Sequence, residues 1–275
     1  MGKAEWGAEP EFFGPRHAHR EGRITAALRA ARLRPGRHLE CAAGVGSLAI
    51  ALARAGHTVV AADRSLPSLL VARRRAMAVG FPGQVLAVLA DVTALPFVDG
   101  CCDSASSAET LEHIPDHGGA AAELARVLRP GGWLVGTVPA GPEQWSDWDV
   151  WASHLRRYTV NEMRSLLADA GLEPRVVRWG WPLARLYDEL FLKRVNRRRL
   201  HSSRPATADP ALRTVAGLGR RRWLVRTVRT VLALDRIFDG APWGVGLLFA
   251  AHKPEPGTAR SGAASAPADA PPAEP

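Results

Sequence analysis

Short apolar segments alternate with amphipathic segments along the first half of the chain. The short segments predict strands at 38–42, 58–62, 85–90, 103–108 and 133–138. The segments between them place apolar residues at helical spacing and stop at glycine; they are LAIALARAG, LPSLLVARRRAMAVG and GGAAAELARVLRPGG. Alternation of strands and helices with short connections predicts an α/β fold with a doubly wound sheet, covered by helices on both faces.

The pattern changes after Pro139. Residues 141–159 are aromatic and polar and predict a loop or broken helix, and they are followed by a helix at 160–171 and a strand at 172–179. A basic, mostly helical insertion from about 181 to 240 precedes a last apolar strand at 244–253. We therefore expect an N-terminal helical lid over 1–35, one domain over 36–253, and a disordered Pro/Ala/Gly/Ser-rich tail over 254–275.

Composition limits the class of protein. A chain of 275 residues with 47% hydrophobic residues can bury one large α/β core. Its three cysteines have no disulfide or metal spacing, which is typical of a reducing compartment. No apolar run approaches the roughly 20 residues that cross a bilayer, and the first residues lack the apolar region of a signal peptide. The expected location is cytoplasmic.

Basic residues crowd the segment from Arg175 to Arg236, so the net charge of +9 either reflects a solvated basic surface or serves an anionic partner, whose contact would lie in this segment. The basic segment 183–236 overlaps two stretches, 183–200 and 223–238, in which apolar residues share a face with arginines around them. One interpretation is peripheral contact with an anionic membrane or a phosphorylated substrate; the other is a pair of cap helices with solvated charged faces. No recognised RNA-binding module is present, so a nucleic-acid substrate is not expected.

The stretch from His38 to Ser65, HLECAAGVGSLAIALARAGHTVVAADRS, places a turn of small residues between a strand and a helix. Gly44 and Gly46 let a ligand approach the backbone there, and the helix N-terminus offers free N–H groups. Asp63 follows about 20 positions later, where a carboxylate suits the two hydroxyls of a ribose. The pattern predicts a ligand that contains adenosine, and dinucleotides and S-adenosylmethionine (SAM) share it.

Three further features favour SAM over a dinucleotide. Glu40, at the end of the first strand, is an acid placed to meet a methionine amino group, whereas a dinucleotide puts its pyrophosphate at this turn. Asp91, after the third strand, is placed to accept a hydrogen bond from the adenine amine beside the apolar Val92. The segment 123–139 predicts a helix, an Arg-Pro-Gly-Gly turn and a fifth strand. Together these features predict SAM as the cofactor.

The region from about 38 to 171 resembles a class I SAM-dependent methyltransferase of the small-molecule type 11 family. Five segments in order carry the resemblance: LECAAGVG (39–46), AADRS (61–65), LADVTALPF (89–97), SAETLEHIPD (107–116) and ARVLRPGG (125–132). The resemblance implies a Rossmann-like sheet of seven strands whose last strand, here 244–253, is antiparallel. The segment 147–172 also resembles a bacterial subgroup often linked to sugars, glycolipids or secondary metabolites.

The resemblance also implies roles for individual residues. Glu40 with the turn residues Ala42, Ala43, Gly44 and Gly46 would hold the methionine end. Asp63 would bind the ribose, and Asp91 and Val92 would bind the adenine. Ser107 and Glu109 would line the open side of the cofactor, and Arg64 is a further cofactor-binding candidate. His17, His19 and Arg20 resemble residues that close over SAM. The family usually has glycine where this chain has Ala42, and alanine is compatible with the turn if its φ is negative.

The implied reaction is transfer of the sulfonium methyl group to a small-molecule acceptor, with a hydroxyl of a sugar, glycolipid or secondary metabolite as the suggested target. A hydroxyl acceptor benefits from a base, and the candidates are His154 and His113, with Asp149 to orient His154. Both histidines also fit a packing role. No metal site is expected. A nicotinamide-dependent oxidoreductase and a non-catalytic SAM-binding scaffold remain as alternatives.

Overall fold

Seven strands form one sheet in the computed structural model, which describes residues 14–32, 34–195, 197, 217 and 221–256. The strands are β1 (Arg37–Cys41), β2 (Thr58–Asp63), β3 (Val85–Leu89), β4 (Cys102–Ala108), β5 (Leu128–Pro139), β6 (Glu173–Trp179) and β7 (Gly246–His252), in the order β3-β2-β1-β4-β5-β7-β6. Neighbouring strands from β3 to β5 are parallel, and β7 is antiparallel to both β5 and β6. The predicted doubly wound sheet with an antiparallel last strand is confirmed.

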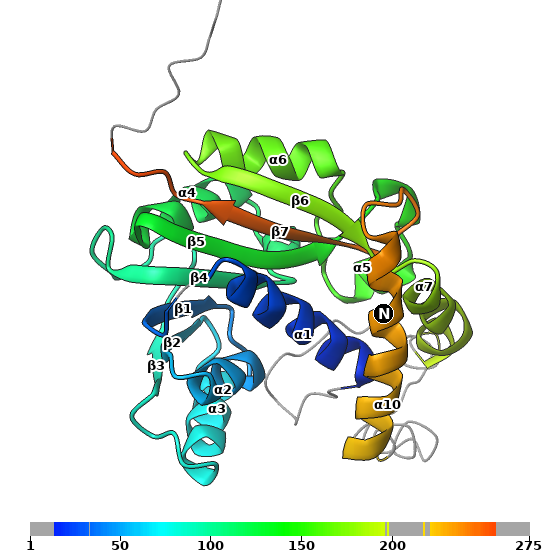
Figure 1. The fold of residues 1–275 in the computed structure, drawn as a ribbon, viewed down its shortest axis with the longest axis horizontal. Coiled ribbons are helices and arrows are strands. Elements are labelled where there is room, and N and C mark those ends of the chain that lie inside the picture. The colour runs from blue at the N-terminus through cyan, green and yellow to red at the C-terminus, as the bar shows by residue number, and fades with distance from the viewer. Residues whose placement is uncertain (1–13, 33, 196, 198–216, 218–220, 257–275) are drawn as a thin grey trace, which may run out of the picture.

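Helices cover both faces of this sheet (Figure 1). The α-helices are α1 (Pro15–Ala30), α2 (Ser47–Arg54), α3 (Leu66–Ala78), α4 (His117–Val127), α5 (Asp147–Trp151), α6 (Val160–Asp169), α7 (Leu183–Tyr187) and α10 (Arg222–Ala233). Shorter turns are η1 (Leu111–His113), η2 (Pro142–Gln144), the π-helical η3 (Asp188–Leu192) and η4 (Leu234–Phe238). Because side chains alternate along a strand, Leu134 joins the core under α4 and α6, whereas Val135 joins the core under α1, α2 and α3.

The predicted Arg-Pro-Gly-Gly turn before the fifth strand is wrong. These residues belong to β5, which starts at Leu128 rather than at Trp133. Leu128 pairs with Cys102 and Trp133 with Ser104, so the partner strand advances by two residues while β5 advances by five. Gly131, with a φ of 75°, takes up this irregularity. A bulge of this kind keeps the chain beside its neighbour where local sequence indicates a reversal.

The N-terminal helix α1 packs against α10, at the far end of the sequence. Arg23 donates two hydrogen bonds to Asp239, at 2.9 and 2.6 Å, and Arg16 donates to Asp188 at 3.1 Å. Both guanidinium groups also lie over the ring of Trp179, at 4.4 Å for Arg16 and 5.5 Å for Arg23. The helix that precedes the sheet is thus held by the segment that follows β6.

Several predictions concern residues outside the described ranges. Of the expected lid, residues 14–32 and 34–35 are described, and α1 begins at Pro15, earlier than the apolar spacing from Ile24 indicates. The described parts of the basic insertion are mostly helical, and 198–216 and 218–220 lie outside the description. Of the expected tail, only residues 254–256 are described.

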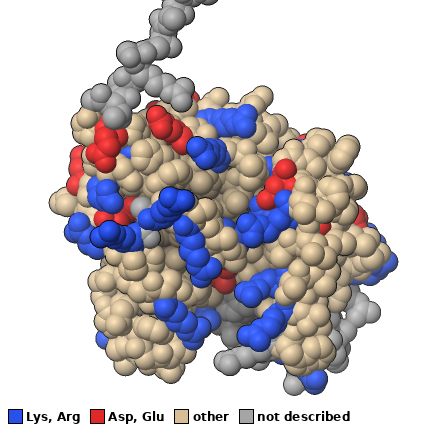
Figure 2. Space-filling model, in the orientation of Figure 1, with Lys and Arg blue, Asp and Glu red and all other residues tan. Residues whose placement is uncertain are grey.

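The face that carries α1 and α10 shows many more basic than acidic side chains (Figure 2). Large apolar side chains on α10, on η4 and after them are exposed as well, among them Trp223, Ile237 and Phe238. Within the described ranges, no helix combines the length and the apolar character needed to cross a membrane.

Candidate active site

The turn from β1 to α2 is built on left-handed backbone. Ala42, Gly44 and Gly46 have φ values of 54°, 53° and 73°. The expectation that Ala42 has a negative φ is wrong: the backbone is left-handed there, and the Ala43 N–H then donates to the Ala62 carbonyl of β2 at 3.1 Å. Left-handed backbone costs a residue with a Cβ about 1–2 kcal/mol. The packing of the turn against β2 therefore overrides the preference of alanine.

Gly46 is required by packing as well as by its backbone angle. A Cβ there would lie 2.8 Å from the Cβ of Ala72 on α3. Gly46 is also the N-cap of α2, and no side chain caps this helix end. The first N–H groups of α2 therefore stay available to an anionic group, such as the carboxylate of a bound amino acid.

Glu40 is buried beside this turn. Its Oε2 has no hydrogen-bond partner in the part of the chain that the structure describes. Burial, together with the charge of Glu21, raises the pKa of the Glu40 carboxyl well above its usual value. A buried carboxylate oxygen without a partner is costly unless a ligand donates to it. Glu40 and the N-terminus of α2 together fit the ammonium and carboxylate groups of the methionine end of SAM.

Residues of α1 reach the same turn. Ser47, the first residue of α2, donates to Glu21 and lies 3.2 Å from His17 Nε2. Glu21 also lies 2.9 Å from His17. The family resemblance pointed to His17 but not to Glu21. A single acidic residue on a basic helix carries no local signal of where its side chain will pack.

Asp63, at the end of β2, shapes the turn from the neighbouring strand. Its Oδ2 accepts from the Gly44 N–H and its Oδ1 from the Ser65 N–H, both at 2.8 Å. Each carboxylate oxygen keeps a second lone pair, so Asp63 can also accept from ribose hydroxyls. The neighbouring Arg64 is exposed to solvent, and nothing around it indicates a contact with the cofactor.

The predicted adenine residues lie after β3. Asp91 is exposed, and its Oδ1 accepts from the backbone N–H and the hydroxyl of Thr93, at 2.9 and 2.8 Å. These two hydrogen bonds lower the pKa of Asp91. Val92 is buried beside it. Asp91 thus presents an ionised acceptor next to an apolar surface, as an adenine ring with an exocyclic amine requires.

Ser107, near the end of β4, pairs with Cys41 just before the cofactor turn, and Glu109 directly follows the strand. The Ser107 hydroxyl is buried and has no partner among the described residues. Glu109 has a φ of 53°, its N–H donates to the Thr137 carbonyl at 2.8 Å, and its carboxylate lies 3.6 Å from Arg20. Although burial raises the pKa of Glu109, the charges of Arg20 and Arg16 bring it below its usual value. Glu109 is therefore an ionised group between the cofactor turn and the chain beyond β4.

The three predicted catalytic residues come together beyond Glu109. His154 Nδ1 lies 2.8 Å from Asp149 Oδ1, and the rings of His154 and His113 meet edge to face at 4.8 Å. Arg157 donates to both oxygens of Asp149, at 2.8 and 2.9 Å. Asp149 also accepts from the Ser146 N–H and so caps α5. The aspartate is thus in a position to hold the orientation of His154.

The sequence did not single out Glu112, although it lies next to His113. Glu112 is fully buried, and neither of its carboxylate oxygens has a partner elsewhere in the described chain. Burial, with the charge of Glu109, raises its pKa well above the usual value. The Leu155 N–H donates to the Glu112 carbonyl at 2.8 Å, which ties η1 to the loop that carries His154.

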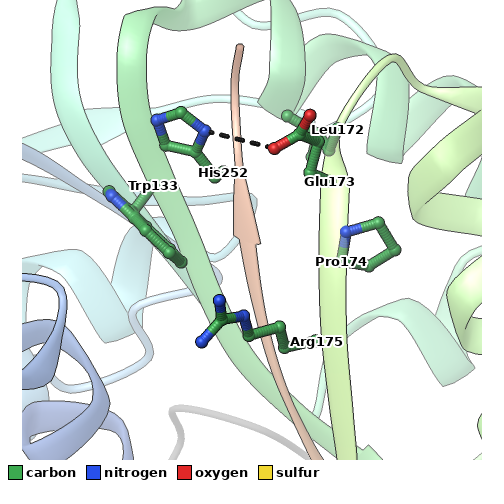
Figure 3. Close-up of a pocket in the computed structure, with 6 residues that line it drawn as sticks. All are labelled: Trp133, Leu172, Glu173, Pro174, Arg175 and His252. Atoms are coloured by element: carbon green, nitrogen blue, oxygen red, sulfur yellow. Dashed lines mark ion pairs between the residues drawn. The ribbon is translucent and has the colours of Figure 1, made fainter. Parts of the chain in front are cut away.

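A separate cavity of about 560 Å³ lies at the opposite end of the sheet (Figure 3). It is lined by residues of β5, β6 and β7 and of the chain before β6: Trp133, Leu172, Glu173, Pro174, Arg175 and His252. Glu173 and His252 form an ion pair across it at 3.7 Å. None of the predicted site residues lines this cavity, so it is not the candidate active site.

Comparison with known proteins identifies the family of the chain. The methyltransferase domain family matches residues 39–136. A demethylmenaquinone methyltransferase of Mycobacterium marinum is 30% identical over 174 residues, which cover 57% of this chain and 72% of that protein. The chain belongs to the class I SAM-dependent methyltransferases. SAM is the cofactor of this methyltransferase family, and the predicted family and cofactor are confirmed.

Other matches are shorter or more distant. A demethylmenaquinone methyltransferase of Thermus thermophilus is 44% identical over 103 residues, which cover 37% of this chain and 46% of that protein. The match with this chain therefore spans less than half the length of that relative. The solved structure of the [4+2]-cyclase SpnF superposes with a TM-score of 0.62 at 19% identity, covering 93% of this chain and 88% of that one. At this identity the superposition shows the shared fold.

Proposed function

We propose that the chain transfers the methyl group of SAM to a hydroxyl of a small-molecule acceptor, at the cluster formed by Glu112, His113 and His154. The observation that carries the proposal is the position of Glu109, which lies just before η1 and whose carboxylate lies 3.6 Å from Arg20. Arg20 in turn lies 3.1 Å from His17, which lies 3.2 Å from Ser47 at the start of α2. The cluster is therefore joined to the cofactor turn by direct contacts. An acceptor at the cluster would lie beside the open side of the cofactor.

The sulfonium methyl group is already activated, so the main task of the protein is to align donor and acceptor. Glu40 and the N-terminus of α2 would bind the methionine end, Asp63 the ribose, and Asp91 with Val92 the adenine. The acceptor oxygen then forms its bond to the methyl carbon while the carbon–sulfur bond breaks, and the hydroxyl proton passes to His154. The cluster supplies the groups that activate this hydroxyl.

Two relatives give a first acceptor to test, because both are named demethylmenaquinone methyltransferases. A demethylmenaquinone belongs in the assay beside sugars, glycolipids and secondary metabolites that carry hydroxyls. Because a quinone ring carries carbonyl oxygens and no hydroxyl, a labelled product from it would favour transfer to carbon over the proposed transfer to oxygen. The shared fold does not fix the reaction, since a [4+2]-cyclase has it too. The assay must therefore detect the transferred methyl group itself.

The experiment incubates the purified protein with SAM carrying a deuterated methyl group, first with these acceptors and then with small-molecule extracts, and follows labelled products by mass spectrometry. We expect a labelled product whose formation falls about 10²-fold or more in His154→Gln, because His154 faces the acceptor. Asp147→Asn, an exposed change on the neighbouring α5, should keep full turnover. SAM binding without any labelled product would favour a non-catalytic SAM-binding scaffold. Binding of NADH instead of SAM would favour an oxidoreductase.

We also infer a peripheral contact between α10–η4 and anionic membranes. Exposed apolar side chains support it: Trp223 is 64% and Ile237 81% exposed, beside the exposed Arg226 and Arg229. Flotation with vesicles of anionic or zwitterionic lipid tests it. We expect binding to the anionic vesicles only, and weaker binding for Ile237→Ser. The matched change Val98→Ser, at a residue 75% exposed outside α10 and η4, should have no effect.

A further inference from the structure

Three potential metal ligands converge at the acceptor side of the site. Glu112, His113 and His154 each offer one ligand atom, and these atoms all lie within 4.8 Å of one another. They come from η1 and from the loop after α5, which the hydrogen bond from Leu155 to the Glu112 carbonyl holds together. We propose that this Glu-His-His cluster binds a divalent transition-metal ion.

Glu112 gives the strongest reason for this proposal. Its side chain is fully buried, and both carboxylate oxygens lack a partner within the described residues. Buried polar groups in folded proteins are nearly always satisfied by a protein group, a water or an ion. A cation between Glu112 and the two imidazoles satisfies both oxygens and compensates the buried charge.

The two histidines are held as metal-binding histidines usually are. A ligating imidazole commonly donates its other ring N–H to a carboxylate or a backbone carbonyl. His154 Nδ1 lies 2.8 Å from the Asp149 carboxylate, and His113 Nδ1 lies 3.3 Å from the Ser153 carbonyl. Because these oxygens can only accept, each Nδ1 carries the proton and each Nε2 keeps its lone pair. The same arrangement makes Asp149 a positioning residue for the metal.

The donor set decides the class of ion. Two imidazole nitrogens and one carboxylate suit Zn²⁺ and other borderline divalent ions, whereas Mg²⁺ and Ca²⁺ prefer all-oxygen sites. Tetrahedral zinc with bonds of about 2.0–2.1 Å holds its ligand atoms about 3.3 Å apart, so modest side-chain rotations close the present triangle. Within the described residues, the three protein ligands leave a fourth position for another ligand, which is typical of catalytic rather than structural zinc.

The open position gives the site a role that rests on the proposed function. An acceptor hydroxyl bound there loses its proton to solvent more readily, because the cation stabilises the oxygen anion. That oxygen then takes the methyl group, and S-adenosylhomocysteine leaves. The cation would thus replace direct proton abstraction by His154, and metal binding itself needs no acceptor and no SAM.

The test measures metal binding to the full chain without SAM. The protein is stripped with EDTA and titrated with Zn²⁺ against a chromophoric chelator, and with Co²⁺ by visible absorption. We expect one equivalent per chain and a cobalt spectrum of a four-coordinate site without the charge-transfer band of thiolate ligands, which excludes binding by the three free cysteines.

Variants locate the site. Glu112→Gln and His154→Gln should each weaken zinc binding at least tenfold, and Asp149→Asn about 10–100-fold through its effect on His154. His252→Gln is the matched control, because His252 also pairs with a glutamate, Glu173, but has no third ligand in the described cavity (Figure 3). Circular dichroism of the stripped proteins checks that each variant folds.

Less than a tenth of an equivalent bound to the folded wild-type chain would overturn the proposal. So would zinc affinity that is unchanged in both Glu112→Gln and His154→Gln. Because no methyl transfer is measured, a failure here is separate from a failure of the proposed function.

Discussion

Replacing Asp149 by asparagine tests whether one buried carboxylate holds the loop that carries His154. Asp149 is 0% exposed, and its two oxygens accept from His154, from Arg157 twice and from the Ser146 N–H. Asparagine keeps the shape but turns one oxygen into an NH₂ group that faces these donors. It also removes the charge that compensates the guanidinium of Arg157, which is 12% exposed.

Removing one partner of a buried ion pair costs about 3–5 kcal/mol. Arg157 keeps a hydrogen bond to the Ala140 carbonyl at 3.3 Å and some contact with solvent, so we expect the lower end, about 3 kcal/mol. Burial raises the pKa of Asp149, but hydrogen bonds from His154 and Arg157 outweigh it and leave the pKa well below its usual value. The contribution of the Asp149 carboxylate to the free energy of unfolding is therefore complete at neutral pH. It is lost only as the pH falls below the usual carboxyl range.

Urea unfolding at neutral pH, followed by tryptophan fluorescence in the presence of EDTA, measures this difference. With an m-value of about 3 kcal/mol/M, the midpoint of Asp149→Asn should fall by about 1 M. Asp147→Asn, on the exposed side of the same helix, should unfold with the wild type. A midpoint for Asp149→Asn equal to that of Asp147→Asn would refute the reasoning.

Three further changes test other parts of the molecule. Asp63→Asn should weaken SAM binding about tenfold or more in calorimetry, because it loses a charged acceptor for ribose hydroxyls; unchanged affinity would count against the ribose role. Gly136→Ala should unfold at much lower temperature, since its Cβ would collide with the Ser107 carbonyl and the Phe249 ring, whereas Gly22→Ala, with nothing within 4 Å, should be neutral or stabilising. Burial lowers the pKa of His38 to about 3, so the unfolded chain binds a proton that the native chain does not between about pH 6.5 and 3. Stability should therefore fall on acidification through this window, by about 1.5 kcal/mol from pH 6.5 to 5, and His38→Gln should lose that part of the pH dependence.

The sheet and the cofactor turn were predictable because their signals are local. Apolar runs between glycines predict β1 to β4 to within a residue or two, and Asp63 follows its turn at the spacing that an adenosine ligand requires. The angle at Ala42 was not predictable, because the contact of the turn with β2 decides it rather than the preference of alanine. The early start of β5 likewise depends on its neighbour β4.

The acceptor side was predictable in part. His113, His154 and Asp149 were chosen by residue type and position, and the fold brings them together. Glu112 was missed, because an acidic residue in an exposed-looking motif gives no sign that it will be buried without a partner. Such information arises only when η1 and the loop after α5 close on each other.

The ion pair between Arg23 and Asp239 joins residues 216 positions apart. During synthesis the ribosome releases β1, the turn and Asp63 long before it adds Asp239, and closing so long a segment costs chain entropy. A nascent chain can form the first strands, but it cannot hold α1, with His17 and Glu21, over the turn until α10 has been made. Completion of the cofactor site therefore has to await the synthesis of α10 and Asp239, so truncated chains that lack α10 should lose the α1 side of the site even where their sheet has formed.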